Sequence, residues 1–171
     1  MASTFGASQQ EDLVVLLDSA PRPAADAAEP FIVASDGRVI VTYPIAESDF
    51  ERFGPFDPDD DPFCAVLFAD AVFHRLGPPG DADLAIHPLA AQGLSGYTVH
   101  EVVNSSLCAE IAMVATGSMA IAPAAPAAPA RRHFVITFQA STFECVASDY
   151  TVIGVFGAGE IASREAFALA R

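Results

Sequence analysis

A run of β-branched and aromatic residues at 133–156 constrains the fold of this chain more than any other stretch. Its first part alternates bulky and smaller side chains and places Phe134, Ile136 and Phe138 on one face, the period-two pattern of a strand. Two short polar segments divide the run, which therefore predicts three consecutive antiparallel strands. An isolated hairpin is marginal in water, so we expect the rest of the chain to cover this meander.

Further strands are predicted upstream. Residues 31–34 and 38–43 are β-branched runs on either side of an Asp-Gly turn, which is a strong hairpin signal. Residues 63–75 fit one long strand, although their apolar spacing also fits a helix. Residues 97–103 alternate well enough to predict another strand.

Three helices are predicted. Residues 9–18 follow a Ser-x-x-Glu capping box and favour a short helix, with a strand as the alternative because two valines lie within the run. Residues 107–116 follow an Asn-Ser-Ser cap and place apolar residues on one face, namely Leu107, Ile111 and Val114. Residues 161–169 predict a closing helix with a modest stripe formed by Ile161, Ala168 and Leu169.

These patterns together predict an α+β fold, with a mainly antiparallel, curved sheet of about six strands covered by two or three helices. At 171 residues the chain suits one domain with an arm. Prolines between residues 21 and 30 indicate that residues 1–30 are an arm and linker and that residues 31–171 form a single α+β domain. Repeated Pro-Ala-Ala at 120–130 predicts a stiff connector within that domain.

The charge balance limits the classes of partner. Twenty-two acidic residues against eight basic residues give a formal net charge of −14, which repels phosphate and anionic lipid. We therefore expect no nucleic-acid and no membrane partner, and a basic protein partner is favoured. The most concentrated acidic surface is a loop that contains Asp57, Asp59, Asp60 and Asp61.

The same acidic loop has part of the sequence pattern of a calcium-binding site. Asp57, Asp59 and Asp61 have the spacing that opens an EF-hand loop, but Pro62 replaces the required glycine and Phe68 replaces the bidentate glutamate. The four histidines include no i, i+4 pair on a predicted helix. We therefore predict neither a metal nor a cofactor.

Four residues are candidates for a catalytic or small-molecule site: His100, His133, Glu144 and Cys108. The two histidines and the glutamate come together if strands 97–103 and 133–139 are neighbours. Cys108 lies in the first turn of a predicted helix, where the helix N-terminus lowers a thiol pKa. Each of the four also suits an ordinary structural position in a strand or a helix.

The cellular setting is inferred from what the sequence lacks. Three widely spaced cysteines indicate reduced thiols, and neither a basic leader nor an apolar run of membrane length is present, so we expect a cytoplasmic protein. The sequence predicts a non-catalytic binding domain that engages a protein partner through an acidic surface. The alternative is a small enzyme or small-molecule-binding protein with a pocket between sheet and helices, and self-association is compatible with both.

Overall fold

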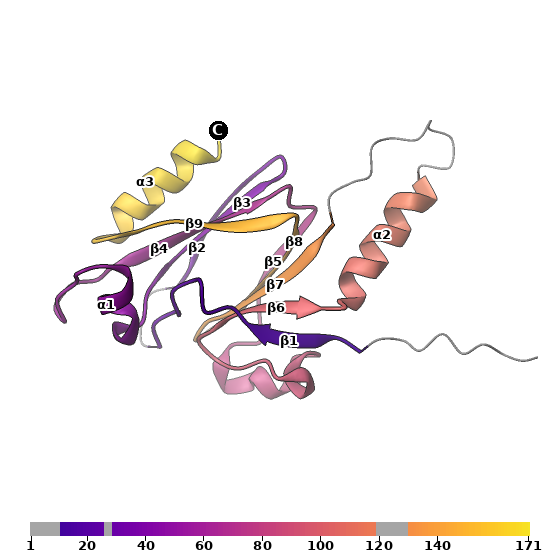
Figure 1. Ribbon diagram of the computed structural model, residues 1–171, viewed down its shortest axis with the longest axis horizontal. Coiled ribbons are helices and arrows are strands. Elements are labelled where there is room, and N and C mark those ends of the chain that lie inside the picture. The colour runs from indigo at the N-terminus through magenta and orange to yellow at the C-terminus, as the bar shows by residue number, and fades with distance from the viewer. Residues whose placement is uncertain (1–10, 26–28, 119–129) are drawn as a thin grey trace, which may run out of the picture.

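A computed structural model describes residues 11–25, 29–118 and 130–171, and within these residues two antiparallel sheets pack together (Figure 1). The five-stranded sheet has the order β1 (Leu13–Leu16), β6 (Val99–Val103), β7 (Arg132–Thr137), β8 (Thr142–Ala147) and β5 (Phe73–Gly77). The four-stranded sheet has the order β2 (Phe31–Ser35), β3 (Arg38–Pro44), β4 (Phe63–Ala69) and β9 (Asp149–Phe156). The α+β class and the antiparallel pairing are confirmed, but a single sheet of about six strands is wrong.

The main core lies between the inner faces of the two sheets. Phe68 of β4 is fully buried, and its ring lies 5.4 Å from those of Phe134 in β7 and Phe143 in β8. Tyr150 of β9 completes the aromatic cluster, with its ring centroid 5.2 Å from that of Phe134. The phenylalanines that dominate the strand run at 133–156 therefore hold one sheet against the other.

The chain crosses between the sheets twice at one corner. Asp70, with φ of 50°, ends β4 and separates it from β5, so the single strand predicted at 63–75 is wrong. Ser148 separates β8 from β9, and its amide and hydroxyl both donate to the carbonyl oxygen of Ala69, at 2.9 Å and 3.0 Å. Strand β9 pairs with β4 and not with β8, so the predicted meander is correct only for its first hairpin.

The described part of the N-terminal 30 residues contacts the sheets. Residues 13–16 form β1, which pairs with β6, so the helix predicted at 9–18 is wrong and its strand alternative is correct. The Tyr43 hydroxyl donates to the carbonyl oxygen of Pro21 at 2.8 Å. The division into an arm and a domain stays a prediction.

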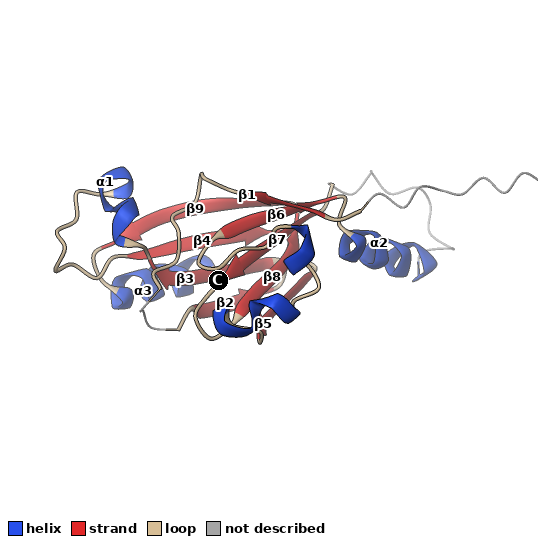
Figure 2. Cartoon of the chain, turned by 90° about the horizontal axis from the view of Figure 1, so that it is seen from below, coloured by secondary structure: helices blue, strands red, loops and turns tan. Residues whose placement is uncertain are grey.

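Two of the predicted helices are present. Helix α3 (Gly159–Leu169) covers the outer face of the four-stranded sheet, and it does so through buried Ala162 and Ala166 rather than through the predicted stripe, since Ile161 is 45% exposed. Helix α2 (Ser106–Ser118) projects from the end of the five-stranded sheet (Figure 2). Val114 is 76% exposed, so the predicted apolar face of this helix is not fully packed.

The remaining short helices of the described ranges are α1 (Phe50–Phe53) and three 3₁₀ turns, at Glu47–Asp49, Asp81–Ile86 and Ala90–Gln92. Nearly all of the connector predicted at 120–130 lies outside the described residues. None of the described helices has both the length and the apolar character needed to cross a bilayer.

Candidate functional site

A buried polar cluster lies on the outer face of the five-stranded sheet. The register of β5 with β8 places Arg75 opposite Glu144, and the register of β7 with β8 places His133 diagonally across from the same glutamate. The segment with the 3₁₀ turns Asp81–Ile86 and Ala90–Gln92 covers this face and brings His87 over it. An apolar cluster fixes the covering segment to the sheet, formed by Leu84, Leu89, Leu94, Val102 and Val135.

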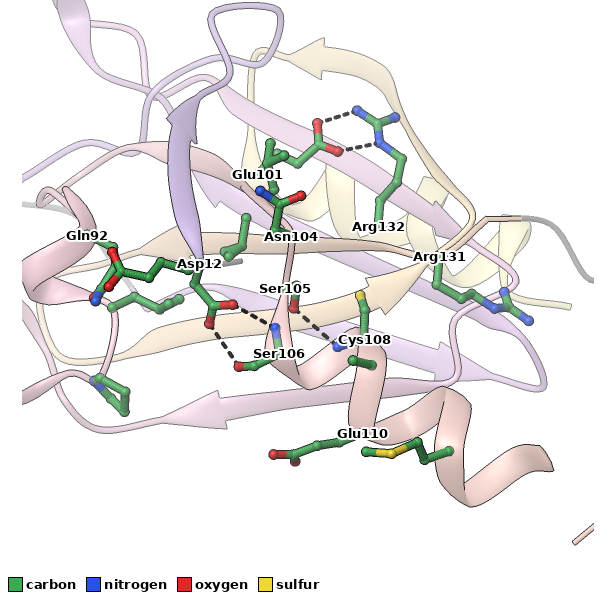
Figure 3. Close-up of a pocket in the computed structure, with 17 residues that line it drawn as sticks. Asp12, Gln92, Glu101, Asn104, Ser105, Ser106, Cys108, Glu110, Arg131 and Arg132 are labelled. Atoms are coloured by element: carbon green, nitrogen blue, oxygen red, sulfur yellow. Dashed lines mark hydrogen bonds and ion pairs between the residues drawn. The ribbon is translucent and has the colours of Figure 1, made fainter. Parts of the chain in front are cut away.

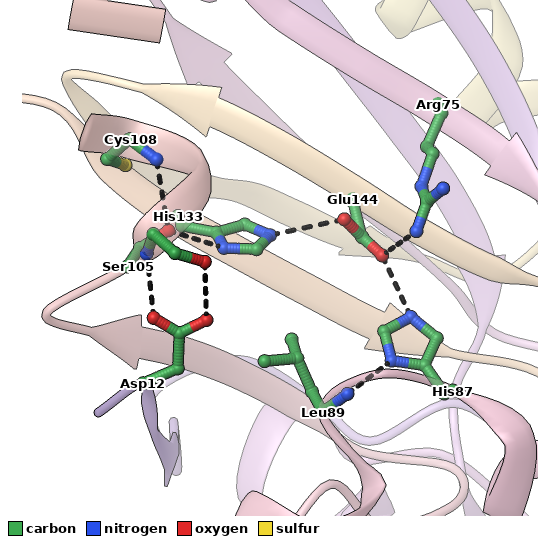
Figure 4. Close-up of polar contacts among 9 residues, drawn as sticks. Asp12, Arg75, His87, Leu89, Ser105, Cys108, His133 and Glu144 are labelled. Atoms are coloured by element: carbon green, nitrogen blue, oxygen red, sulfur yellow. Dashed lines mark hydrogen bonds and ion pairs between the residues drawn. The ribbon is translucent and has the colours of Figure 1, made fainter. Parts of the chain in front are cut away.

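Glu144 is the centre of this cluster, and it is only 4% exposed (Figure 4). Oε1 accepts hydrogen bonds from the Arg75 guanidinium and from His87 Nε2, the latter at 2.8 Å, while Oε2 lies 3.4 Å from His133 Nε2. Burial alone would raise the pKa of Glu144, but its contacts with His133, His87 and Arg75 outweigh burial and hold that pKa far below the usual carboxyl range. Glu144 is therefore a buried carboxylate that stays ionised.

The hydrogen bonds fix the proton on His87. The Leu89 amide donates to His87 Nδ1 at 3.2 Å, so Nδ1 carries a lone pair and Nε2 carries the hydrogen given to Glu144. His87 is thereby a neutral donor. It ties the covering segment to the sheet.

His133 connects the carboxylate to the start of α2. Its Nδ1 lies 2.9 Å from the hydroxyl oxygen of Ser105, which also accepts the Cys108 amide at 3.2 Å as the helix cap. Glu144 Oε2 faces His133 Nε2 as an acceptor, which favours the imidazole hydrogen on Nε2 and leaves Nδ1 to accept from the Ser105 hydroxyl. Within the described residues His133 Nε2 has no well-formed hydrogen bond, although it is buried.

Two cavities adjoin the cluster. An open pocket of about 180 Å³ is lined by Arg75, His87, His133 and Glu144 together with apolar side chains such as Phe73 and Leu107. A larger groove of about 920 Å³ runs between the first turns of α2 and the end of β6, and Ser105 and Cys108 line it (Figure 3). Asp12 borders both cavities and accepts from the Ser106 amide at 2.7 Å and from the Ser106 hydroxyl at 2.9 Å.

The structure brings two of the four sequence candidates together and leaves two apart. His133 and Glu144 are in contact. His100 lies on the same face, but Val135 stands between it and Glu144, and its imidazole contacts the Ser95 and Thr98 hydroxyls at 3.1 Å. Burial lowers the pKa of His100 to about 4, which makes it a neutral structural residue at ordinary pH.

Cys108 joins this cluster through Ser105. Its backbone amide donates to the Ser105 hydroxyl, and burial raises the pKa of its thiol, although a side-chain hydrogen bond with Ser105 opposes that rise. All three cysteines are free. The expectation of a thiol activated by the helix N-terminus is therefore not supported by the environment of this side chain.

Sequence reasoning missed Arg75, His87 and Ser105. Ser105 carried a usable signal, since it stands between a predicted strand and a predicted helix. His87 carried none, because a histidine in a covering loop has no periodic pattern. Arg75 was hidden inside the strand predicted at 63–75, whose break at Asp70 was not recognised.

The acidic loop stands apart from this cluster. Asp57, Asp59, Asp60 and Asp61 are all exposed, and the Asp57 amide donates to Asp60 Oδ2 at 2.7 Å. Among the residues with described positions, no group of three or more histidine, cysteine or acidic side chains is arranged to hold a metal ion.

Strand β1 forms one border of the five-stranded sheet (Figure 1). Its apolar side chains are unusually open to solvent, with Leu13 53% exposed, Val15 40% and Leu16 47%. The Leu17 amide donates to the carbonyl oxygen of Val99 at 2.8 Å, which continues the pairing of β1 with β6.

No family model, curated protein or solved structure matches this chain.

Proposed function

We propose that the protein binds an extended segment of a protein partner, which adds a strand to the border of the five-stranded sheet at β1. The observation that carries this proposal is the exposed apolar strand Leu13–Leu16, which pairs with β6 on one side and with no described residue on the other. Soluble proteins normally protect a bare apolar edge with charge, proline or a covering element. An unprotected edge is suited to strand addition.

The backbone of β1 offers donors and acceptors to such a partner. The Leu17 amide points toward β6, and alternate residues of an antiparallel strand point the same way, so Leu13 and Val15 also face β6. The amide and carbonyl groups of Val14 and Leu16 therefore face the open side. A partner strand can take hydrogen bonds from these two residues without disturbing the existing sheet.

The charges around β1 select the partner. Glu11 and Asp12 precede the strand and Asp18 follows it, while no basic residue lies between positions 11 and 18. Opposite charge on the incoming segment would speed its association and fix its position along the edge. We infer a partner segment with β-branched residues at its centre and basic residues at both ends.

Strand addition is tested with a fluorescent peptide of alternating valine and threonine that carries arginine at both ends. We expect the fluorescence anisotropy of this peptide to rise with added protein, and the binding to weaken as salt is added. Leu16→Pro removes an amide that faces the open side and should abolish the rise. Leu16→Thr keeps that amide and should retain most of it, so equal binding by the two variants would contradict strand addition.

The acidic loop is a second candidate surface for a basic partner, and it is favoured by the exposure of all four of its aspartates. The same peptide distinguishes the two surfaces. If the loop is the site, replacement of Asp57, Asp59, Asp60 and Asp61 by Asn lowers binding at low salt, and Leu16→Pro has no effect. If β1 is the site, the loop variant binds almost as well as the unmodified protein.

A further inference from the structure

Ser105 lies where strand β6 turns into helix α2, a place where a side chain is held in one orientation. Asn104, with φ of 59°, makes the turn in the left-handed region that favours few residues, and α2 begins at Ser106. Ser105 lines the 920 Å³ groove on one side and contacts His133 on the other. It is therefore positioned between a space open to solvent and a buried base.

The three side chains Ser105, His133 and Glu144 form a continuous series. The Ser105 oxygen lies 2.9 Å from His133 Nδ1, and His133 Nε2 lies 3.4 Å from Glu144 Oε2. A serine, a base within hydrogen-bond reach and a group that orients the base are the elements of nucleophilic catalysis. Because the Glu144 carboxylate is an acceptor that faces Nε2, the imidazole hydrogen lies on Nε2, and Nδ1 offers a lone pair to the serine hydrogen.

We propose that Ser105 is the nucleophile of an acyl hydrolase activity toward uncharged carboxylic esters, with His133 as its general base. The Ser105 oxygen attacks the ester carbonyl carbon while its proton passes to His133 Nδ1, and the tetrahedral intermediate collapses as that proton passes to the leaving alkoxide. The alcohol departs and leaves an ester on Ser105. Water then attacks this ester, giving its proton to His133, which returns it to Ser105 as the acid is released.

The chemical class of substrate follows from the groove. Its walls carry four acidic residues and two arginines, and Arg132 is already paired with Glu101, so acid is in excess and an anionic ester is disfavoured. Apolar side chains such as Val103 and Met113 offer contact to an uncharged acyl or alkyl group. Glu144 lies behind His133 and does not line this groove. It is a positioning residue, which holds the imidazole hydrogen on Nε2 and stabilises the imidazolium that forms during attack.

Asp12 accepts the hydrogen bond of a backbone amide that would otherwise stabilise the tetrahedral intermediate. The Ser106 amide is the backbone donor adjacent to the nucleophile, and Asp12 Oδ1 accepts from it at 2.7 Å. An oxyanion needs such a donor. The activity is therefore restrained until Asp12 moves aside, and removing its carboxylate should raise the rate.

The activity is tested on the full chain with a fluorophosphonate probe, whose site of attachment is read by mass spectrometry, and with p-nitrophenyl acetate hydrolysis. We expect one label, on Ser105. His133→Gln should slow labelling by about 100-fold, the usual contribution of a general base. Ser163→Ala, which alters a serine on α3, should label at the unmodified rate, and Asp12→Ala should label faster.

The variants are chosen so that a loss of activity can be distinguished from a loss of folding. Ser105→Asn removes the nucleophile but supplies an equally good helix cap, so it should retain the native circular dichroism spectrum and lose all labelling. If the asparagine variant does not fold, Ser105→Cys serves as the second test. It keeps a nucleophile at the same position and should give a burst of p-nitrophenol. Glu144→Gln should lower kcat and leave KM nearly unchanged. A label on another residue, no label at all, or labelling of His133→Gln at the unmodified rate overturns the proposal.

Discussion

Phe68→Ala is expected to lower the free energy of unfolding by about 3–5 kcal/mol, the range for removing a buried aromatic side chain from a core. The ring is fully buried where the two sheets meet, and it contacts Phe134, Phe143 and Tyr150, of which the first two belong to the opposite sheet. A cavity at this position removes contacts from both sheets at once. Urea titration followed by circular dichroism measures the loss.

Phe167→Ala is the matched control for this effect. The same atoms are removed from α3, where the Phe167 side chain is 54% exposed and its ring lies 5.5 Å from that of Phe31, which is itself exposed. We expect a loss below about 1 kcal/mol, as for most surface substitutions. Similar losses for the two variants would show that the interface between the sheets is not the main source of stability.

Glu144→Ala is expected to lower the free energy of unfolding by about 2–4 kcal/mol, because each buried donor left without an acceptor costs about 1–3 kcal/mol. Buried His87 would lose its hydrogen-bond acceptor, and buried His133 would lose the negative charge that lies 3.4 Å from its Nε2. The Arg75 side chain is 53% exposed and can turn its charge to water, so it adds little to this loss. Glu165→Ala on the exposed side of α3 should have almost no effect.

The contribution of Glu144 depends on pH with a definite sign. The folded protein holds the pKa of this carboxyl below the value of about 4.3 expected in the unfolded chain. The stabilisation is therefore complete above the unfolded pKa and is lost as the pH falls through the folded pKa. We expect the stability difference between the unmodified protein and Glu144→Gln to be largest near neutral pH and to shrink below about pH 4. A difference that stays constant down to pH 3 would contradict an ionised Glu144.

Local signals in the sequence predicted the hairpins well and the pairing between sheets poorly. The Asp-Gly turn at Gly37, with φ of 71°, produces the β2–β3 hairpin as predicted, since turn chemistry acts over a few residues. The separation of β9 from β8 depends on one residue, Ser148, and on its contacts with Ala69 and Asp70 more than 70 positions away. A contact between residues so far apart produces no periodic pattern in the sequence.

The candidate site was predictable only where strand register brought residues together. His133 and Glu144 belong to two strands joined by a short turn, so their proximity follows from the hairpin. Strand β6, which carries His100, pairs with β7 as predicted. The register of that pair, however, places Val135 between His100 and Glu144. His87 reached the site through the packing of Leu84, Leu89 and Leu94 on the sheet, which no local pattern specifies.

Each sheet takes strands from both halves of the chain, and this limits how the molecule can be divided. A cut between β4 and β5 leaves β2, β3 and β4 without β9, and separates β1 from β6. Neither fragment then holds all the strands of one sheet, and each exposes the aromatic surface that the other covers. The two fragments would therefore have to fold together. If the protein is cut at Ala71, we expect structure to return only when both fragments are mixed.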